Sequence, residues 1–396
     1  MTKPFFTLLC GARVFAPRDM GIQNILIAGD KIAAVCPTAT APTNYPCQIV
    51  DLTDCILMPG FIDSHVHITG GGGEGGFATR TPEILLSQIT TSGVTTVVGC
   101  LGTDGTTRSV INLLAKTRGL CAEGISAYMY TGAYELPTPT ITGSVRSDII
   151  IIDKIIGTGE IAMSDHRSAQ PTCQEYKNLA AQARVGGMLS SKAGIVDMHI
   201  GDGKSGLSML FEITANSEIP KSQFIPTHIN RNQQLLIEGI KWAKQGGIMD
   251  ITSGVSPESG SVQAVKPSQA AKRALENGVA TTNITMSSDG NGSVPLFDAT
   301  GNTIGVGVAS QKSMLQEIRD MIKTEKIAPD TAIKFVTSNV ADILKLSQKG
   351  QVKESFDADF TVVDKDFQLK HVWARGQHMI DNGQAIVFGT FEQNSL

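Results

Sequence analysis

Residues 59–67 read PGFIDSHVH, a short apolar run that ends in two histidines, His65 and His67. Side chains two positions apart on a β-strand point to the same face of the sheet, so both imidazoles are expected on one side. Counting Cys55–His67 as the first, eight such runs follow one another, separated by stretches of helical spacing. This alternation predicts a parallel sheet, and eight units over roughly 280 residues favour a (β/α)8 TIM-type barrel.

The expected barrel strands are Cys55–His67, Gly93–Leu101, Ile125–Thr131, Glu160–Ser164, Gly194–Ile200, Phe224–His228, Ile248–Ile251 and Ile284–Ser287. The expected helices are Thr81–Ser92, Arg108–Glu123, Gln174–Met188, Gln233–Gln245, Pro267–Asn277 and Ser313–Thr324.

The two ends of the chain differ from this middle part. Both carry short runs of β-branched and aromatic residues with turn signals, Gly29-Asp30 near the start and Asn382-Gly383 near the end. The expected strands are Phe6–Val14, Ile22–Ala28, Lys31–Val35, Gln48–Asp51, Phe360–Val363, His371–Ala374, Gly376–Ile380 and Gln384–Phe388. We therefore expect a small β-sandwich domain built from residues 1–58 and 345–396, beside a barrel of residues 59–344.

The composition, with 41% hydrophobic and 18% charged residues among 396, is that of a folded globular protein. A formal net charge of −4 gives no reason to expect a nucleic-acid or membrane partner. No segment has the roughly 20 apolar residues of a transmembrane helix. Seven scattered cysteines without a C-x-x-C pair indicate reduced thiols. We expect a cytoplasmic homo-oligomer whose partner is a small molecule.

Five of the seven histidines lie at or just past the ends of the expected barrel strands: His65, His67, His166, His199 and His228. Active sites of such barrels are built at this edge. Together with Asp289, after the last strand, the histidines supply imidazole and carboxylate ligands that suit zinc. Any one of these histidines alone could be a structural residue of the core or surface. Four of them with an aspartate favour a metal site.

The segment PGFIDSHVH, with DADFTVV at residues 357–363, resembles the amidohydrolase superfamily. The resemblance narrows to the isoaspartyl dipeptidases and covers essentially the whole chain. It is carried by GGGGE (70–74), LGTD (101–104), TGAY (131–134), SDHRS (164–168), PTHINRN (226–232) and SSDGNGS (287–293). It implies hydrolysis of the isopeptide bond of β-aspartyl dipeptides by metal-activated hydroxide. Asp289 would be the general base and acid.

The resemblance also implies two zinc ions per subunit. His65, His67 and Asp289 would bind one, and His199 and His228 the second. Tyr134 would polarise the scissile carbonyl, and Glu74 would bind the substrate α-amino group. The other implied substrate-binding residues are Arg167, Arg231, Thr103 and Ser293, which would bind carboxylates, and Gly72 of the glycine-rich loop. A β-aspartyl dipeptide carries one amine and two carboxylates, which an acid and two arginines complement.

One position departs from the family. A lysine carboxylated by carbon dioxide bridges the two metals there, whereas this chain has Glu160. The nearest lysines, Lys154 and Lys192, do not align with the strand end. We expect Glu160 to bridge both metals as an unmodified carboxylate. Its stem is shorter, so the second metal should be held more weakly. The alternative is that Glu160 faces solvent or pairs with a lysine or arginine.

Two other functions stay open at this point. Another amidohydrolase, acting on cyclic amides or N-acyl amino acids, would share the metal ligands but should lack the set of Glu74, Arg167 and Arg231. A non-catalytic relative would fit the missing lysine but should have lost several ligands. Among single residues, Tyr134 could be a plain rim tyrosine, Ser293 a turn residue and Glu74 a solvated loop acid.

Overall fold

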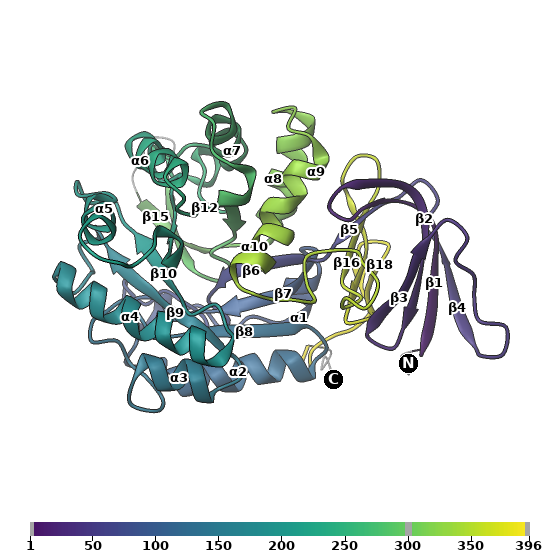
Figure 1. Ribbon diagram of the computed structural model, residues 1–396, viewed down its shortest axis with the longest axis horizontal. Helices are drawn as coiled ribbons and strands as arrows, with labels where there is room; N and C mark the ends of the chain where they lie inside the picture. The colour runs from purple at the N-terminus through teal and green to yellow at the C-terminus, as the bar shows by residue number, and fades with distance from the viewer. Residues whose placement is uncertain (1–3, 298–302, 393–396) are drawn as a thin grey trace.

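The computed structural model describes residues 4–297 and 303–392. A curled parallel sheet covered by helices lies beside a second sheet formed by both ends of the chain (Figure 1). None of the helices in the described residues is both long enough and apolar enough to cross a lipid bilayer.

The second sheet has nine strands in the order β19-β18-β17-β16-β5-β1-β2-β3, with β4 also paired to β1. Its strands are β1 Phe6–Phe15, β2 Asp19–Ala28, β3 Lys31–Cys36, β4 Cys47–Asp51, β5 Ile56–Pro59, β16 Phe360–Val363, β17 Leu369–Ala374, β18 Gln377–Asp381 and β19 Gln384–Ala385. The two chain ends meet where β5 and β16 pair antiparallel, with Pro59 opposite Phe360. The expected strands at both ends are confirmed, although Gln384–Phe388 is a strand only over its first two residues.

The run Cys55–His67 is two strands in two different sheets, so the expectation of a single strand was wrong. β5 belongs to the nine-stranded sheet, and β6 (Phe61–Val66) begins the parallel sheet. Gly60 separates them at a point where a Cβ would overlap the side chain of Thr95. Both strands are largely buried, so the apolar pattern runs on through the junction and hides it.

The curled sheet contains β6, β7, β8, β9, β10 and β11 in sequence order, all parallel, and β12 pairs with β13. The further bounds are β7 Val94–Gly99, β8 Ser126–Thr131, β9 Ile155–Met163, β10 Ile195–Ile200, β11 Phe224–Thr227, β12 Met249–Thr252 and β13 Ile284–Ser287. Nearly all of their residues are buried, as expected for parallel strands covered on both faces. Strand β9 begins at Ile155, five residues before the expected start at Glu160. The prediction began too late because the segment Gly157-Thr158-Gly159 has the composition of a turn.

The helices are α1 Leu86–Thr90, α2 Val110–Ala122, α3 Val145–Ile151, α4 Cys173–Ser190, α5 Ser208–Ala215, α6 Gln233–Lys244, α7 Pro267–Glu276, α8 Lys312–Lys323, α9 Pro329–Ala332 and α10 Ser338–Ile343. Short 3-10 turns are η1 Phe77–Thr79, η2 Lys221–Gln223, η3 Pro257–Ser259, η4 Thr281–Asn283 and η5 Ile333–Val336. Helix α4 begins with a capping box between Thr172 and Glu175, which satisfies the free N–H groups of its first turn. Helix α1 is shorter than the expected Thr81–Ser92.

Several elements of the barrel region were not expected from the sequence. Helices α3, α5, α9 and α10 are short, and an antiparallel hairpin of β14 (Ser293–Phe297) and β15 (Thr303–Val308) follows β13. This hairpin starts at Ser293, four residues after Asp289. It therefore begins at the edge where the parallel strands end.

Candidate active site

Five parallel strands bring polar side chains together at their carboxyl ends. Glu160 of β9 lies at the centre of this group and is buried. Its Oε2 atom is 3.0 Å from His65 Nε2, 3.1 Å from His199 Nδ1 and 3.4 Å from His228 Nε2. These imidazoles come from β6, β10 and the residue after β11. Glu160 therefore lies among the histidines and does not face solvent, and its bridging of two metals stays a prediction.

Asp289 approaches the same centre from the turn after β13. Its Oδ1 atom is 3.0 Å from His67 Nε2 and 3.7 Å from His65 Nε2. Asp289 and His228 both have left-handed backbones, with φ of 57° and 64°. Such conformations are uncommon for residues other than glycine and recur at functional sites. Each follows the end of its strand and turns the side chain toward Glu160 and the other imidazoles.

Each of the four histidines has one ring nitrogen engaged by a partner away from this centre. The partners are Asp197 Oδ2 for His65 Nδ1 at 2.9 Å, Cys100 Sγ for His67 Nδ1 at 3.9 Å, Asp165 Oδ2 for His199 Nε2 at 2.9 Å and Thr252 Oγ1 for His228 Nδ1 at 2.8 Å. A histidine that binds a metal through one nitrogen is typically held by such a partner at the other. The remaining nitrogens all face Glu160 or Asp289.

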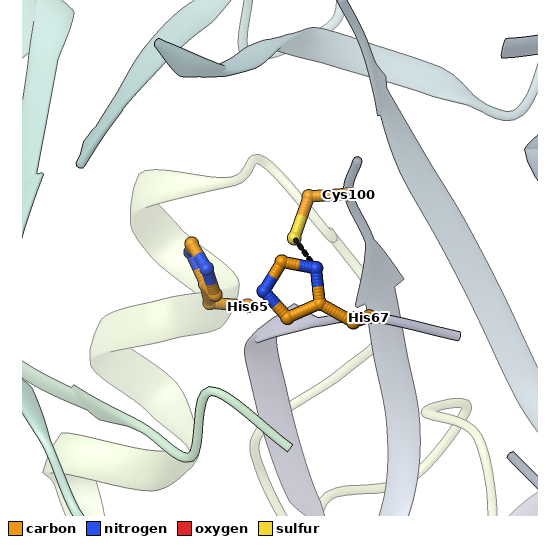
Figure 2. Close-up of side chains that lie close together, drawn as sticks. All are labelled: His65, His67 and Cys100. Carbon is orange, nitrogen blue, oxygen red and sulfur yellow. Dashed lines mark hydrogen bonds between the residues drawn. The ribbon is translucent and has the colours of Figure 1, made fainter. Parts of the chain in front are cut away.

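Figure 2 shows the Cys100 side chain directed at the ring of His67, with His65 alongside. Cys100 directly follows β7 and is fully buried. One nitrogen of each imidazole and the sulfur lie within 4.8 Å of one another. The thiol therefore contacts the ring nitrogen of His67 that faces away from the centre, as an aspartate or a threonine does for the other three histidines.

The arrangement fits a bound cation. Glu160 Oε1 is buried and has no hydrogen-bond partner among the described residues, and His65 Nε2 has none despite its 3.0 Å approach to Glu160 Oε2. A buried polar atom without a partner is costly, and a metal ion would satisfy both. One ligand atom each of His65, Glu160 and His228 lies within 4.8 Å of the others. Imidazole nitrogens with carboxylate oxygens are a donor set of the zinc type.

The charges of the buried centre also favour a bound cation. Burial opposes ionisation of Glu160, but the neighbouring His65 and His199 hold the pKa of its carboxyl well below its usual range. Burial likewise opposes ionisation of Asp289, and its contact with His67 keeps that pKa low. Burial lowers the pKa of His228 to about 3. At neutral pH the two carboxylates are therefore ionised and His228 is neutral. Neighbouring negative charges raise the pKa values of His65 and His67 despite their burial, so these two imidazoles would release protons when a cation binds.

Next to this centre is an open pocket of about 810 Å³. All the substrate-binding residues expected from the sequence line it: Gly72, Glu74, Thr103, Arg167, Arg231 and Ser293. His67, Glu160, His199 and Asp289 form its floor. The pocket therefore joins the buried polar centre to solvent.

Glu74 and Arg167 contact each other across the pocket. Glu74 Oε1 lies 3.1 Å from Arg167 Nη1 and accepts a hydrogen bond of 2.9 Å from Thr103 Oγ1. Arg167 is also held by two hydrogen bonds to Asp165, through Nε and Nη2 at 2.9 and 2.8 Å. Arg231 has a buried Nε without a hydrogen-bond partner among the described residues. An anionic ligand would satisfy it.

The glycine-rich loop that carries Glu74 is held from below by Arg108. The Arg108 guanidinium is buried and donates to the carbonyls of Gly71 and Thr81, at 3.1 and 2.9 Å. Gly72 has φ of 72°, and a Cβ there would lie 2.9 Å from Ser293 Cβ. Loop and β14 thus pack tightly beside the pocket.

Tyr134 stands between the centre and the pocket. Its hydroxyl is 2.8 Å from His199 Nδ1, and the Arg167 guanidinium lies 5.4 Å from the centroid of its ring. Burial raises the pKa of the Tyr134 hydroxyl well above its ordinary value, so the group stays protonated and can donate. Tyr134 is not a plain surface tyrosine.

His166 lies outside the site, because its side chain is 89% exposed. Its neighbour Asp165 points inward instead and holds both His199 and Arg167. Sequence reasoning gave no role to Asp165, Asp197 or Cys100. Alternation along a strand was the available signal for Asp197, which stands two positions before His199 on β10 and therefore shares its face.

Residues 224–387 match the amidohydrolase family. The chain is 42% identical to β-aspartyl dipeptidase of the thermophilic, keratin-degrading Fervidobacterium islandicum AW-1, in a crystal structure with β-Asp-Leu dipeptide, over 97% of this chain and 98% of that one, with a TM-score of 0.90. A second crystal structure of β-aspartyl dipeptidase from that organism is 41% identical to this chain. The match covers 96% of this chain and 98% of that one, with a TM-score of 0.87. A stretch of 49 residues, 12% of either chain, is 39% identical to imidazolonepropionase of Photorhabdus laumondii.

Proposed function

The chain belongs to the β-aspartyl dipeptidases of the amidohydrolase family, and we propose that it hydrolyses the isopeptide bond of β-aspartyl dipeptides in a metal-dependent reaction. The proposal rests on one observation: a cluster of candidate metal ligands and a cluster of charged substrate-binding residues line the same pocket. Four imidazoles and two carboxylates would form a cation site, and one acid with two arginines lies beside it. A hydrolase of cyclic amides would not need the second group.

The residues that would hold the metal are His65, His67 and Asp289 for one ion and His199 and His228 for a second. Glu160 would lie between them, since its carboxylate contacts imidazoles of both sets. We propose zinc, two ions per subunit, with the second held more weakly. When bound, such ions polarise a carbonyl and lower the pKa of water to near 7.

Asp289 would move the proton. Its Oδ1 atom faces the imidazoles at the floor of the pocket, and its low pKa keeps it ionised at neutral pH. It would accept a proton from the attacking water and deliver it to the leaving amine. Tyr134 would donate its hydroxyl proton in a hydrogen bond to the carbonyl oxygen as negative charge develops there.

The remaining residues would orient the dipeptide. Glu74 would accept the substrate ammonium, and Arg167 and Arg231 would bind its carboxylates, with Thr103, Ser293 and the Gly72 backbone completing the pocket. The contact between Glu74 and Arg167 shows that these opposite charges lie at salt-bridge distance. A ligand with an amine and a carboxylate on one carbon matches that spacing, because each end replaces one half of the existing pair.

We propose that the six-stranded parallel sheet and the pair of β12 and β13 close into one barrel of eight parallel strands. We propose that β11 meets β12 and that β13 meets β6. Ile229 N donates to Asp250 O at 3.2 Å, and a parallel bridge joins Val66 to Gly290. The catalytic barrel would span residues 59–344, with residues 1–58 and 345–396 as the small domain. The homo-oligomer and the cytoplasmic location stay predictions.

Comparison of three substrates tests the function. Purified enzyme should cleave β-linked Asp-Leu, leave α-linked Asp-Leu intact and act poorly on N-acetyl-β-Asp-Leu, which has no ammonium for Glu74. Release of leucine measures all three. Equal cleavage of the acetylated dipeptide would remove Glu74 from its role, and equal cleavage of the α-linked one would contradict the proposed specificity.

A further inference from the structure

Of the three histidines that lie outside the active site, two face each other in the nine-stranded sheet. His371 is on β17 and His378 on β18, in the yellow C-terminal part of Figure 1. Their ring centroids are 5.4 Å apart. Asp381, the last residue of β18, completes a group of three whose ligand atoms all lie within 4.8 Å of one another.

A β-bulge brings these side chains to one face. Antiparallel pairing sets Val372 opposite Ile380 and Trp373 opposite His378, which leaves Met379 as an extra residue on β18. His371 and Trp373 are two apart and share a face. The bulge turns His378 onto that same face, and the register continues to set Asp381 across from His371. Without the extra residue, His378 and Asp381 would point to opposite sides.

The distances match those between the ligands of a tetrahedral ion. His371 Nδ1 lies 3.3 Å from His378 Nε2 and 3.3 Å from Asp381 Oδ1. Two ligands bound at about 2.0–2.1 Å in a tetrahedral site are roughly 3.3–3.4 Å apart. Two of the three distances within the trio therefore have the length that a tetrahedral zinc site requires, and all three ligand atoms lie within 4.8 Å of one another. The half-exposed Asp381 side chain gives the trio access to solvent.

Hydrogen bonding within the trio is incomplete when both rings are neutral. His371 Nδ1 faces two atoms that can accept a proton, His378 Nε2 and the Asp381 carboxylate, and carries one proton at most. If His378 donates to His371 instead, the lone pair of His371 Nδ1 and the charge of Asp381 face each other. A divalent cation would accept lone pairs from all three atoms at once.

We propose that His371, His378 and Asp381 form a second metal site, separate from the active site, that binds a divalent ion of the zinc class. Two imidazoles select such an ion over magnesium or calcium, which prefer oxygen ligands. The ion clips β17 to β18. Trp373 stacks on His378, with ring centroids 4.2 Å apart and planes at 4°, so the site carries its own spectroscopic reporter.

The test compares zinc content between enzyme and variant. Wild-type enzyme and His378→Gln are dialysed against the same buffered free zinc, and bound zinc is measured per chain. The wild-type chain should hold one zinc ion more than the variant. Zinc titration followed by calorimetry should show an affinity for that ion at least about tenfold weaker in Asp381→Asn, since loss of even an outer partner of a ligand costs that much.

Asp366→Asn is the matched control, because it removes an exposed carboxylate just before β17 and leaves the trio intact. Its zinc content should equal that of the wild type. Addition of Ni²⁺ should quench part of the tryptophan emission in wild-type enzyme and in Asp366→Asn, and less in His378→Gln. Hydrolysis of β-Asp-Leu should be unchanged in His378→Gln, which separates this site from the proposed function.

Equal zinc content and equal quenching in wild type and His378→Gln would overturn the proposal. So would loss of the additional ion in Asp366→Asn. Because His378 and Asp381 are both partly exposed, these variants test the site without opening the buried core around His371. A failure of the active-site assignment would leave the difference of one zinc ion unchanged.

Discussion

Replacement of Glu160 by glutamine keeps the shape of the side chain and removes its charge. In the wild type, one carboxylate oxygen lies 3.0, 3.1 and 3.4 Å from three imidazole nitrogens, and in the variant a neutral amide takes its place. Because Glu160 is fully buried, solvent cannot substitute for the lost charge. We expect Glu160→Gln to bind the second zinc ion much more weakly and to lose nearly all activity.

The magnitude follows from the burial. Removal of one partner from a buried charge pair costs about 3–5 kcal/mol. That free energy corresponds to roughly a hundredfold to several-thousandfold in metal affinity. Zinc per chain after dialysis and kcat for β-Asp-Leu are the two measurements. Reconstitution of the wild-type enzyme should proceed equally with and without bicarbonate, since glutamate needs no carboxylation.

Glu317→Gln serves as the matched control. Glu317 is also a buried glutamate, on α8, and its carboxylate lies 3.1 Å from Lys266 rather than near the histidines. This variant should lose stability but keep its zinc. Full zinc content with normal turnover in Glu160→Gln would refute the reasoning and leave Glu160 without a role in holding metal.

Three further substitutions test the site. Asp289→Asn should lower kcat by about 10²–10⁴-fold, as loss of a positioned acid–base group does, and near-normal turnover in a stopped assay would show that another group moves the proton. Tyr134→Phe should lower kcat by roughly 10²–10³-fold with little change in zinc content, because one donor to the oxyanion is lost; an unchanged kcat would exclude that role. Glu74→Gln should lower kcat/KM for β-Asp-Leu, since the substrate ammonium then lacks its counter-charge. The variant's preference for the free over the N-acetylated dipeptide should shrink, and an unchanged preference would contradict the assignment.

Much of this architecture could be predicted, because strand and helix periodicities are local properties of the sequence. The six parallel strands of the curled sheet, the parallel pair of β12 and β13, and the β-rich ends all follow from such patterns. The division of residues 55–67 between two sheets does not, since burial on both sides of Gly60 gives one continuous apolar run. The hairpin of β14 and β15 was missed for a related reason. Its second strand carries Gly305 and Gly307, which interrupt the run of β-branched residues.

The site was predictable where a residue type carries its own chemistry. Histidines at strand ends stood out in this way, whereas the pair of arginines was expected only from the resemblance to a known family. Asp165 and Cys100 did not stand out, because their importance depends on which ring nitrogen they contact, and that is set by tertiary packing. The trio on β17 and β18 depends on a bulge of one residue at Met379, which no sequence pattern marks.

The most direct test of metal-dependent hydrolysis is a zinc titration of chelated enzyme. It is best carried out in the His378→Gln variant, so that the ion between β17 and β18 is not counted. Bound zinc per chain and the rate of β-Asp-Leu hydrolysis are followed together. The chelated enzyme should be inactive, and activity should return as zinc binds and reach its maximum at two ions per chain. Full activity in the metal-free enzyme would contradict the proposed function.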